Sequence, residues 1–215
     1  MSLQIKYLGI QPYESTWEAM QRFTDERTET TPDELWVVEH PPVYTQGLNG
    51  QAKHLQTFAL QQDIPIIQSD RGGQVTYHGP GQIVIYVLLD LKRAKLGVRD
   101  LVHRMEKAII EFLSTLDIPA EARSDAPGVY VNGKKIASLG LKIRKQKSYH
   151  GLALNFDMDL TPFSWITPCG LEGIKITQVS SLIQTPDLKA AQKELIKTLS
   201  HQLQPQISQS PPQPI

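Results

Sequence analysis

One cysteine, Cys169, stands in the stretch SWITPCG (164–170) and is the first candidate for chemistry in this chain of 215 residues. A single cysteine cannot form an internal disulfide, and one thiol is too few for a structural zinc site. It can act as a nucleophile, but free cysteine is also among the residue types most often buried as a small hydrophobic side chain. Composition alone therefore favours a core position for Cys169, and other motifs must decide between the two interpretations.

A second candidate is the glycine-rich stretch RGGQVTYHGPGQ (71–82), which lies between two predicted strands. Its glycines allow the backbone to approach a bound group closely and leave N–H groups available as donors. The spacing is not that of a P-loop, and the chain contains no G-x-G-x-x-G motif. A tight structural connection is the alternative interpretation of this stretch.

Two histidines, His78 and His150, each stand in a Tyr-His-Gly triplet. Taken singly, such histidines are more often ordinary hydrogen-bonded residues than catalytic ones. No H-x-x-x-H pair and no Cys/His cluster occurs, so the sequence predicts no metal site.

Lys135 stands in the stretch VYVNGKKI (129–136), which carries a hairpin signal. The Asn132-Gly133 pair between two β-prone runs predicts a hairpin with a two-residue type I′ turn. In that register Tyr130 pairs with Lys135, and both side chains lie on the same face of the hairpin.

Charge and hydropathy exclude some classes of function. The chain has 22 basic and 22 acidic residues, and this balance argues against a general nucleic-acid-binding protein. No apolar run approaches the roughly 18 residues of a membrane span, and the N-terminus does not resemble a secretory signal. We therefore expect no membrane association and a cytoplasmic location.

Hydrophobic periodicity predicts the remaining elements. Helices are expected over about 15–29, where Ser15 and Glu18 resemble a capping box, over 100–116, and from Thr185-Pro186 to about 203. Strands are expected at 35–38, at 64–68, at 83–89, apolar on both faces, and at 152–158, which alternates like a half-buried strand. The sum is an α/β (α+β) domain, 1–203, with a mixed β-sheet flanked by helices. Residues 204–215, rich in Pro and Gln, are expected to be a disordered tail.

Five motifs together resemble the octanoyl transferases of lipoate biosynthesis, in the order and spacing of that family. They are EHPPVYTQG (39–47), RGGQVTYHGPGQ (71–82), GKKIASLGLKI (133–143), SYHGLALNFDMDL (148–160) and TPCGL (167–171). The resemblance covers most of residues 5–182 and implies the catalytic fold of biotin and lipoate protein ligases. Those ligases have a similar glycine-rich loop but lack the Lys…Pro-Cys-Gly combination in this form.

The resemblance implies a two-step acyl transfer from octanoyl-acyl carrier protein to a lysine of a lipoyl domain. Acceptors would be the lipoyl domains of 2-oxoacid dehydrogenases and glycine cleavage H proteins. Cys169 corresponds to the cysteine that carries the acyl thioester, and Lys135 to the lysine that activates it. No cofactor is implied, because exchange between thioesters is nearly balanced and the amide product is more stable.

How Lys135 would activate the thiol stays open at this stage. A free thiol has a pKa of about 8.5, and a nearby ammonium lowers it. A lysine kept neutral by burial could instead act as the base.

The resemblance also assigns the acyl and carbonyl site to three segments that combine small residues with backbone donors. They supply Arg71, Gly72, Gly73, Gln74, Val75, Thr76, Tyr77 and His78, then Ser138, Leu139 and Gly140, and finally Gly151, Leu152 and Ala153. An apolar slot there would select the acyl chain at about 0.8 kcal/mol per buried methylene.

A basic cluster of Lys142, Arg144, Lys145 and Lys147 stands out in a chain without net charge. It is either a solvated hairpin tip or a surface that attracts an acidic carrier protein or lipoyl domain.

Two other functions compete with the transferase. An ATP-dependent lipoate ligase on the same fold would need a phosphate-holding basic loop and would tolerate the loss of Cys169. A non-catalytic acyl-binding domain would have no need of Lys135 together with Cys169. A cysteine hydrolase is a weaker third possibility, because the sequence places no histidine beside the thiol.

Overall fold

The computed structural model describes residues 3–50, 59, 63–167, 174–184 and 187–204. Three sequence-based expectations therefore lie outside the described residues. They concern Cys169, the start of the last helix at Thr185-Pro186, and nearly all of the expected tail, 205–215.

In the described residues, helices separate groups of consecutive strands along the chain. The strands are β1 (Leu3–Ile10), β2 (Asp33–Glu39), β3 (Val43–Gln46), β4 (Ile66–Gln68), β5 (Val75–His78), β6 (Gln82–Leu88), β7 (Glu121–Ala122), β8 (Val129–Val131), β9 (Lys134–Arg144) and β10 (Lys147–Asn155). The helices are α1 (Tyr13–Glu26), α3 (Leu91–Ala94), α4 (Val98–Ser114) and α5 (Leu188–Leu203), with 3-10 turns η2 (Thr161–Trp165) and η4 (Val179–Ser181).

The strands form two sheets. A seven-stranded sheet has the order β1-β2-β6-β10-β9-β8-β7, and a three-stranded sheet has the order β4-β3-β5. β1 pairs with β2 in parallel, whereas β2, β6, β10 and β9 pair antiparallel. The predicted mixed sheet is confirmed.

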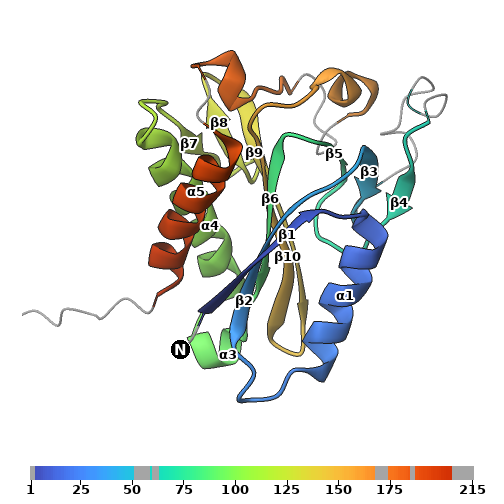
Figure 1. Cartoon of the computed structure of the whole chain (residues 1–215), viewed down its shortest axis with the longest axis vertical. Helices are drawn as coiled ribbons and strands as arrows, with labels where there is room; N and C mark the ends of the chain where they lie inside the picture. Colours follow the sequence, from blue (N-terminus) through green and yellow to red (C-terminus); the bar gives the residue numbers. More distant parts are fainter. Residues whose placement is uncertain (1–2, 51–58, 60–62, 168–173, 185–186, 205–215) are drawn as a thin grey trace, which may run out of the picture.

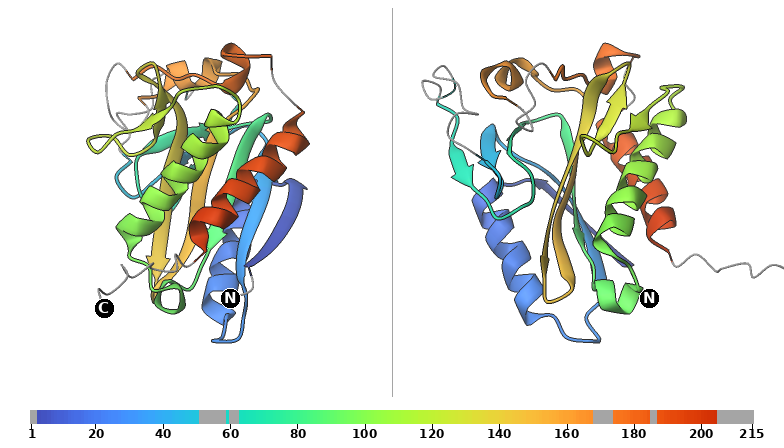
Figure 2. Two further views of the ribbon diagram at one scale, coloured as in Figure 1. Left: turned by 90° about the vertical axis from the view of Figure 1, so that its left-hand side faces the viewer. Right: turned by 180° about the vertical axis from the view of Figure 1, so that it is seen from behind.

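Helices cover both faces of the large sheet. α4 and α5 lie on one face, and α1 lies on the other beside the three-stranded sheet (Figure 1, Figure 2). Alternate residues of β6 enter the two layers: Ile83 and Ile85 pack in the core under α4 and α5, and Val84 packs under α1. β6 is buried along its whole length, as its apolar sequence predicts.

The predicted strand over 152–158 is confirmed only over 152–155, and its predicted half-buried character is wrong. β10 begins at Lys147, ends at Asn155, and is buried from Ser148 onwards. Its alternating small and polar residues, such as Ala153, are covered by the layer that contains α1. Phe156 and Met158 follow the strand and are buried outside it.

Both ends of the first helix also differ from the expectation. α1 begins at Tyr13 with Pro12 as N-cap, and the Ser15 hydroxyl donates to Pro12 O at 3.2 Å, so the capping box does not form. The helix ends at Glu26 because Arg27 turns inward and forms an ion pair with Asp33 at 2.5 Å. In the described residues, α5 extends from Leu188 to Leu203, and the Asp187 carboxylate accepts a hydrogen bond from the Ala190 N–H at 2.9 Å.

The predicted hairpin over 129–136 is confirmed. Asn132 and Gly133 have φ of 49° and 72°, as a type I′ turn requires. Tyr130 pairs with Lys135 across β8 and β9. The hairpin thereby fixes Lys135 beside β8, at the end of β9 farthest from the basic cluster.

Candidate active site

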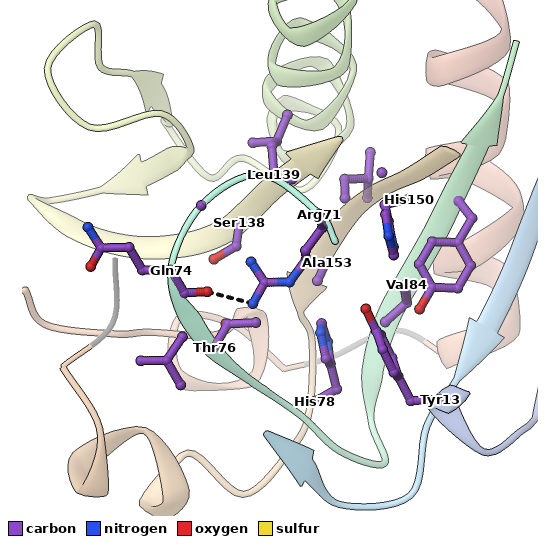
Figure 3. Close-up of a pocket in the computed structure, with 16 residues that line it drawn as sticks. Tyr13, Arg71, Gln74, Thr76, His78, Val84, Ser138, Leu139, His150 and Ala153 are labelled. Atoms are coloured by element: carbon purple, nitrogen blue, oxygen red, sulfur yellow. Dashed lines mark hydrogen bonds between the residues drawn. The ribbon is translucent and has the colours of Figure 1, made fainter. Parts of the chain in front are cut away.

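A narrow cavity of about 60 Å³ lies between the large sheet and the segment that runs from Arg71 to His78 (Figure 3). The residues that line it are Tyr13, Arg71, Gly73, Gln74, Val75, Thr76, His78, Val84, Tyr86, Ser138, Leu139, Gly140, His150, Gly151, Leu152 and Ala153. The fold brings the three predicted segments together because Gly140 pairs with Gly151 between β9 and β10. Apolar side chains such as Val84 and Ala153 form one wall of the cavity.

Two residues expected in this lining do not contribute to it. The Gly72 N–H donates to Leu141 O at 2.9 Å, which docks the glycine-rich segment onto β9. Tyr77 lies on the alternate face of β5, where its ring packs 5.5 Å from that of Tyr44 and 5.6 Å from that of Phe163. Residues 75–78 form a strand, and its alternation separates Tyr77 from its neighbours.

The lining also contains residues that sequence reasoning did not assign to the site. His150 had a visible signal in the second Tyr-His-Gly triplet. Tyr13, Val84 and Tyr86 had none, because only the packing of α1 and β6 beside the glycine-rich segment brings them to the cavity.

Arg71 holds the glycine-rich segment in shape. Its Nη2 donates to Gln74 O at 2.7 Å (Figure 3). The same nitrogen donates to Thr45 O at 2.6 Å, and Nη1 donates to Gly72 O at 3.0 Å. The guanidinium thus joins β3 to the loop before β5. Its donors bind carbonyl oxygens and the Thr45 hydroxyl, so the guanidinium shapes the cavity wall.

The glycine-rich segment packs directly against the backbone of β9 at Gly140. A Cβ atom at position 140 would lie 2.9 Å from Gly72 O and 3.4 Å from the Arg71 side chain. Only glycine therefore allows the loop to contact β9 so closely.

Asp70 connects the same segment to the helix and the sheet. Its carboxylate accepts hydrogen bonds from Trp17 Nε1 at 2.8 Å, from His150 Nε2 at 2.8 Å, and from the Tyr149 hydroxyl. Burial alone would raise the pKa of Asp70, but the hydrogen bonds from His150 and Tyr149 outweigh it and hold the pKa well below its ordinary value. Asp70 is therefore an ionised junction between α1, β10 and the glycine-rich segment.

The histidines around the cavity are neutral. Burial lowers the pKa of His78 to about 3 and that of His40 to about 4, and it also lowers the pKa of His150. Gln82 Nε2 donates to Asn155 Oδ1 at 2.9 Å, so its Oε1 accepts from His78 Nδ1 at 2.7 Å. Uncharged rings of this kind suit a slot for an apolar chain.

Lys135 lines a second, wider cavity of about 440 Å³. This cavity shares Gly73, Gln74 and Leu139 with the narrow one, so the two adjoin. Lys135 is 2% exposed, and its Nζ donates to Pro127 O at 2.9 Å. The amine of a buried lysine thus lies at the wall of an open cavity that leads to an apolar slot.

The chain that follows Cys169 returns to Lys135. The Lys135 N–H donates to Lys175 O at 2.8 Å, and the Thr177 N–H donates to Lys135 O at 2.9 Å. Ile176 forms a parallel bridge with Lys135 and belongs to the same hydrophobic cluster as Ile166. The described residues on both sides of Cys169 therefore pack together near the hairpin that carries Lys135.

The basic cluster lies at the turn between β9 and β10. Arg144 Nε lies 3.1 Å from Asp25 Oδ1, and Lys147 Nζ donates to Arg27 O at 3.0 Å. Lys145 is exposed and has a φ of 49°. Two of the cations are thus turned towards the end of α1, and Lys145 extends from the turn.

Metal-site clusters and membrane-spanning helices are both absent from the described part of the chain. Among these residues, no three His, Cys, Asp or Glu side chains gather as they would around a metal ion. No helix in the same part is long and apolar enough to cross a bilayer.

The fold resembles that of solved ligases at low sequence identity. A lipoate protein ligase from Thermoplasma acidophilum is 16% identical and has a TM-score of 0.75, covering 94% of this chain and 84% of that one. The biotin protein ligase from Aquifex aeolicus is 15% identical with a TM-score of 0.55, covering 93% of this chain and 68% of that one. These likenesses confirm the predicted ligase-type fold.

Sequence relatives are much closer. An octanoyltransferase from Hydrogenovibrio crunogenus is 84% identical over 207 residues, covering 96% of this chain and 99% of that protein. An octanoyltransferase from Vibrio campbellii is 58% identical over 197 residues, covering 92% of this chain and 88% of that protein. The model of the lipoyl protein ligase A/B catalytic domain matches residues 12–200. The chain therefore belongs to the lipoyl protein ligase A/B catalytic-domain family and, within it, to the octanoyltransferases.

Proposed function

We propose that this protein transfers an octanoyl group from acyl carrier protein to a lysine of a lipoyl domain, through a thioester on Cys169 that Lys135 activates. The observation that carries the proposal is the position of Lys135. Its buried amine lies in a wide cavity that adjoins a narrow, largely apolar one. The 84% identity to an octanoyltransferase over nearly the whole chain supports the same reaction.

The two cavities suit the two ends of an acyl thioester. The narrow cavity, with the apolar Val84, Leu152 and Ala153 in its wall, is the site that we assign to the alkyl chain. The wider cavity at Lys135 leaves room for the carrier thiol to depart and for the acceptor lysine to enter. Backbone N–H groups at the junction, near Gly73 and Gln74, are candidates to stabilise the negative oxygen that forms on the carbonyl.

The reaction needs no external energy source. In the first step the Cys169 thiolate attacks the thioester carbonyl, and the carrier thiolate leaves and takes up a proton. In the second step the acceptor amine attacks the new thioester, the Cys169 thiolate leaves, and the amine nitrogen gives up a proton as the amide forms. A positive Lys135 would favour the thiolate in both steps.

The contacts of Lys135 support its pairing with Cys169. Ile176, seven residues after Cys169, is bridged to Lys135 through backbone hydrogen bonds. Ile166, three residues before Cys169, packs in the same cluster as Ile176. The chain between these two residues is long enough for the thiol to reach the amine, as the proposed pairing requires.

The partners follow from the same chemistry. The donor is octanoyl-acyl carrier protein, and the acceptors are lipoyl domains of 2-oxoacid dehydrogenases and glycine cleavage H proteins. The basic turn with Lys145 suits the approach of an acidic partner, which would raise the encounter rate more than the affinity. A reduced thiol is required for activity, so the cytosol is the compartment we expect.

The test is intact-mass measurement after incubation with octanoyl-carrier protein and no nucleotide. An octanoyl adduct should form on the wild-type chain, be absent from Cys169→Ser, and disappear when an unmodified lipoyl domain is added. An acceptor that becomes modified only with ATP, and equally well by Cys169→Ser, would instead identify a ligase. Tight binding of the acyl carrier without any adduct or transfer would identify a binding domain.

A further inference from the structure

The amide between Pro127 and Gly128 has a polar partner on each side. Its oxygen accepts a hydrogen bond from Lys135 Nζ at 2.9 Å. Its N–H donates to Glu106 Oε1 at 3.1 Å, in a buried position. One peptide group therefore lies between a carboxylate and an amine that come from different elements.

Glu106 is unusual for its position. It belongs to α4, which packs against β8 and β9, and it is 8% exposed although it carries a carboxylate. Burying a carboxylate is costly unless it is paired or hydrogen-bonded. Its hydrogen bond reaches out of α4 to the segment that ends at Gly128. A role tied to that segment accounts for a carboxylate at this position.

The segment from Ala126 to Gly128 is held in place from both ends. The Tyr130 hydroxyl donates to Ala126 O at 2.9 Å, and the Glu106 bond fixes the following peptide. Gly128 has a φ of 142°, which only glycine adopts readily. A Cβ atom at position 128 would lie 2.5 Å from Lys135 Cε. The peptide is thus pressed against the lysine side chain and has little freedom to turn away.

A carboxylate bound to an amide N–H draws the proton towards itself and increases the negative charge on the amide oxygen. That oxygen then binds an ammonium donor more strongly than it binds a neutral amine. We propose that Glu106 is a positioning residue that holds Lys135 in its charged form, acting through the Pro127–Gly128 amide. This inference rests on the proposed function, and it selects the ammonium over the neutral base as the form in which Lys135 meets Cys169.

Other charged groups surround the amide and must be considered in any test. Asp125 lines the same cavity as Lys135, but it is exposed and forms an ion pair with Arg123 at 2.6 Å. Lys134 precedes Lys135 and is exposed, and Lys107 follows Glu106 on an exposed position of α4. The ring of Tyr130 faces the Lys135 amine at 5.6 Å.

The single cysteine makes a direct experiment possible. The rate at which iodoacetamide alkylates the substrate-free protein, followed by intact mass from pH 5 to 10, reports the thiolate fraction of Cys169 alone. Glu106→Gln keeps an oxygen for the Gly128 N–H and removes the charge. We expect its alkylation profile to move upwards by about one pH unit, with an about tenfold lower rate at pH 7. The matched control is Glu111→Gln on the same helix, which should follow the wild-type profile.

A double-variant cycle separates action through Lys135 from a direct effect on the thiol. Lys135→Met should shift the profile upwards by itself, and adding Glu106→Gln to it should produce no further shift. Equal shifts from Glu106→Gln with and without Lys135 would overturn the inference, as would a wild-type profile for Glu106→Gln. A wild-type profile for Lys135→Met would instead count against the proposed function.

A second variant guards against loss of folding. Glu106→Asp keeps the charge on a shorter side chain and should recover part of the shift, whereas a purely steric role predicts a worse defect than that of Glu106→Gln. Thermal unfolding midpoints for each variant show that the compared proteins are folded. If Glu106→Gln alone does not fold, the Glu106→Asp profile decides, and an upward shift of about one pH unit or more, although the charge is kept, contradicts the inference.

Discussion

The ε-amino nitrogen of Lys135 lies 5.6 Å from the centre of the Tyr130 ring, directly across the pair formed by β8 and β9. An aromatic face attracts a cation, and the attraction grows where water is excluded. The ring and the carbonyl of Pro127 both contact the amine of a side chain that is almost completely buried. The position of this amine leads to the first prediction.

Replacement of Lys135 by alanine should slow the acylation of Cys169 at neutral pH by at least about a hundredfold, because a positioned proton-transfer or charged group contributes on that scale. A single-turnover reaction with octanoyl-carrier protein, quenched with acid and followed by intact mass, measures the rate. Lys134→Ala removes the same charge from the neighbouring exposed position and should acylate normally. Full acylation by Lys135→Ala would exclude a role for the lysine in this step.

Gly128→Ala should disturb the position of Lys135, since the new Cβ atom would lie 2.5 Å from Lys135 Cε and 2.8 Å from Ala137 O. We expect a loss of acylation of about tenfold or more, and destabilisation of about 1–3 kcal/mol from the strained φ. Gly133→Ala is the matched control, because Gly133 also has a positive φ but no atom within 4 Å of its Cβ position. Equal acylation rates for the two variants would show that the contact with Lys135 is unimportant.

Asp70→Asn should lower the free energy of unfolding by about 1–3 kcal/mol, because an amide cannot replace the carboxylate as acceptor for all of its donors. The folded-state pKa of Asp70 is lowered, so its contribution is present above the ordinary aspartate pKa and is lost as the pH falls through the folded value. Urea unfolding at pH 7 measures the change. Asp125→Asn, at an exposed position, should leave the urea midpoint unchanged, and equal effects of both substitutions would contradict the role of Asp70 as a junction.

The buried histidines predict a loss of stability in mild acid. His78 and His40 have folded-state pKa values of about 3 and about 4, below the ordinary value of 6.5. The unfolded chain therefore binds more protons below pH 6.5, and the free energy of unfolding should fall as the pH drops from there towards 4. Urea midpoints at several pH values measure the slope.

The matched variants for this slope are His78→Asn and His103→Asn. The first removes a buried ring and should flatten the pH dependence between 6.5 and 4, whereas the second removes an exposed ring and should not. An unchanged slope in His78→Asn would mean that this histidine is already protonated in the folded protein.

Ala153→Val should shorten the preferred acyl chain, because Ala153 lines the narrow cavity and is itself almost completely buried. Each buried methylene contributes about 0.8 kcal/mol, so the added methyl groups should lower kcat/KM for octanoyl-carrier protein by about tenfold. The loss with a hexanoyl donor should be smaller. Equal losses with both donors would show that the tail of the chain does not reach Ala153.

Sequence patterns predicted the elements whose formation depends on residues close together in the chain. The Asn132-Gly133 pair fixed the hairpin and the register of Lys135, and the apolar run over 83–89 identified β6. β5 was missed because it lies inside the glycine-rich stretch and exists through its pairing with β3, a partner distant in sequence. β1 was missed for the same reason: it is an edge strand whose side chains are mostly exposed, and its pairing with β2 defines it.

The site residues also divide into those that sequence motifs identified and those that only the structure shows. The motifs gave most of the residues that line the narrow cavity, since these form contiguous runs at Arg71, Ser138 and Gly151. Asp70 and Glu106 were not found, because each acts on the site through another group and carries no motif of its own. Only the three-dimensional contacts show that a carboxylate on α4 reaches the amide beside Lys135.

The bridge between Lys135 and Ile176 takes the place beside β9 that β10 leaves when it ends at Asn155. The sheet is therefore completed at this point by the chain that follows Cys169, through two amide hydrogens, those of Lys135 and Thr177. If these two hydrogen bonds opened locally, the segment around Ile176 would separate from the hairpin without unfolding the rest of the sheet. Deuterium exchange at the Lys135 and Thr177 amides would then measure the fraction of molecules in which the segment is detached. The fraction of enzyme that is competent would be set by this local folding equilibrium, which can be measured without substrate.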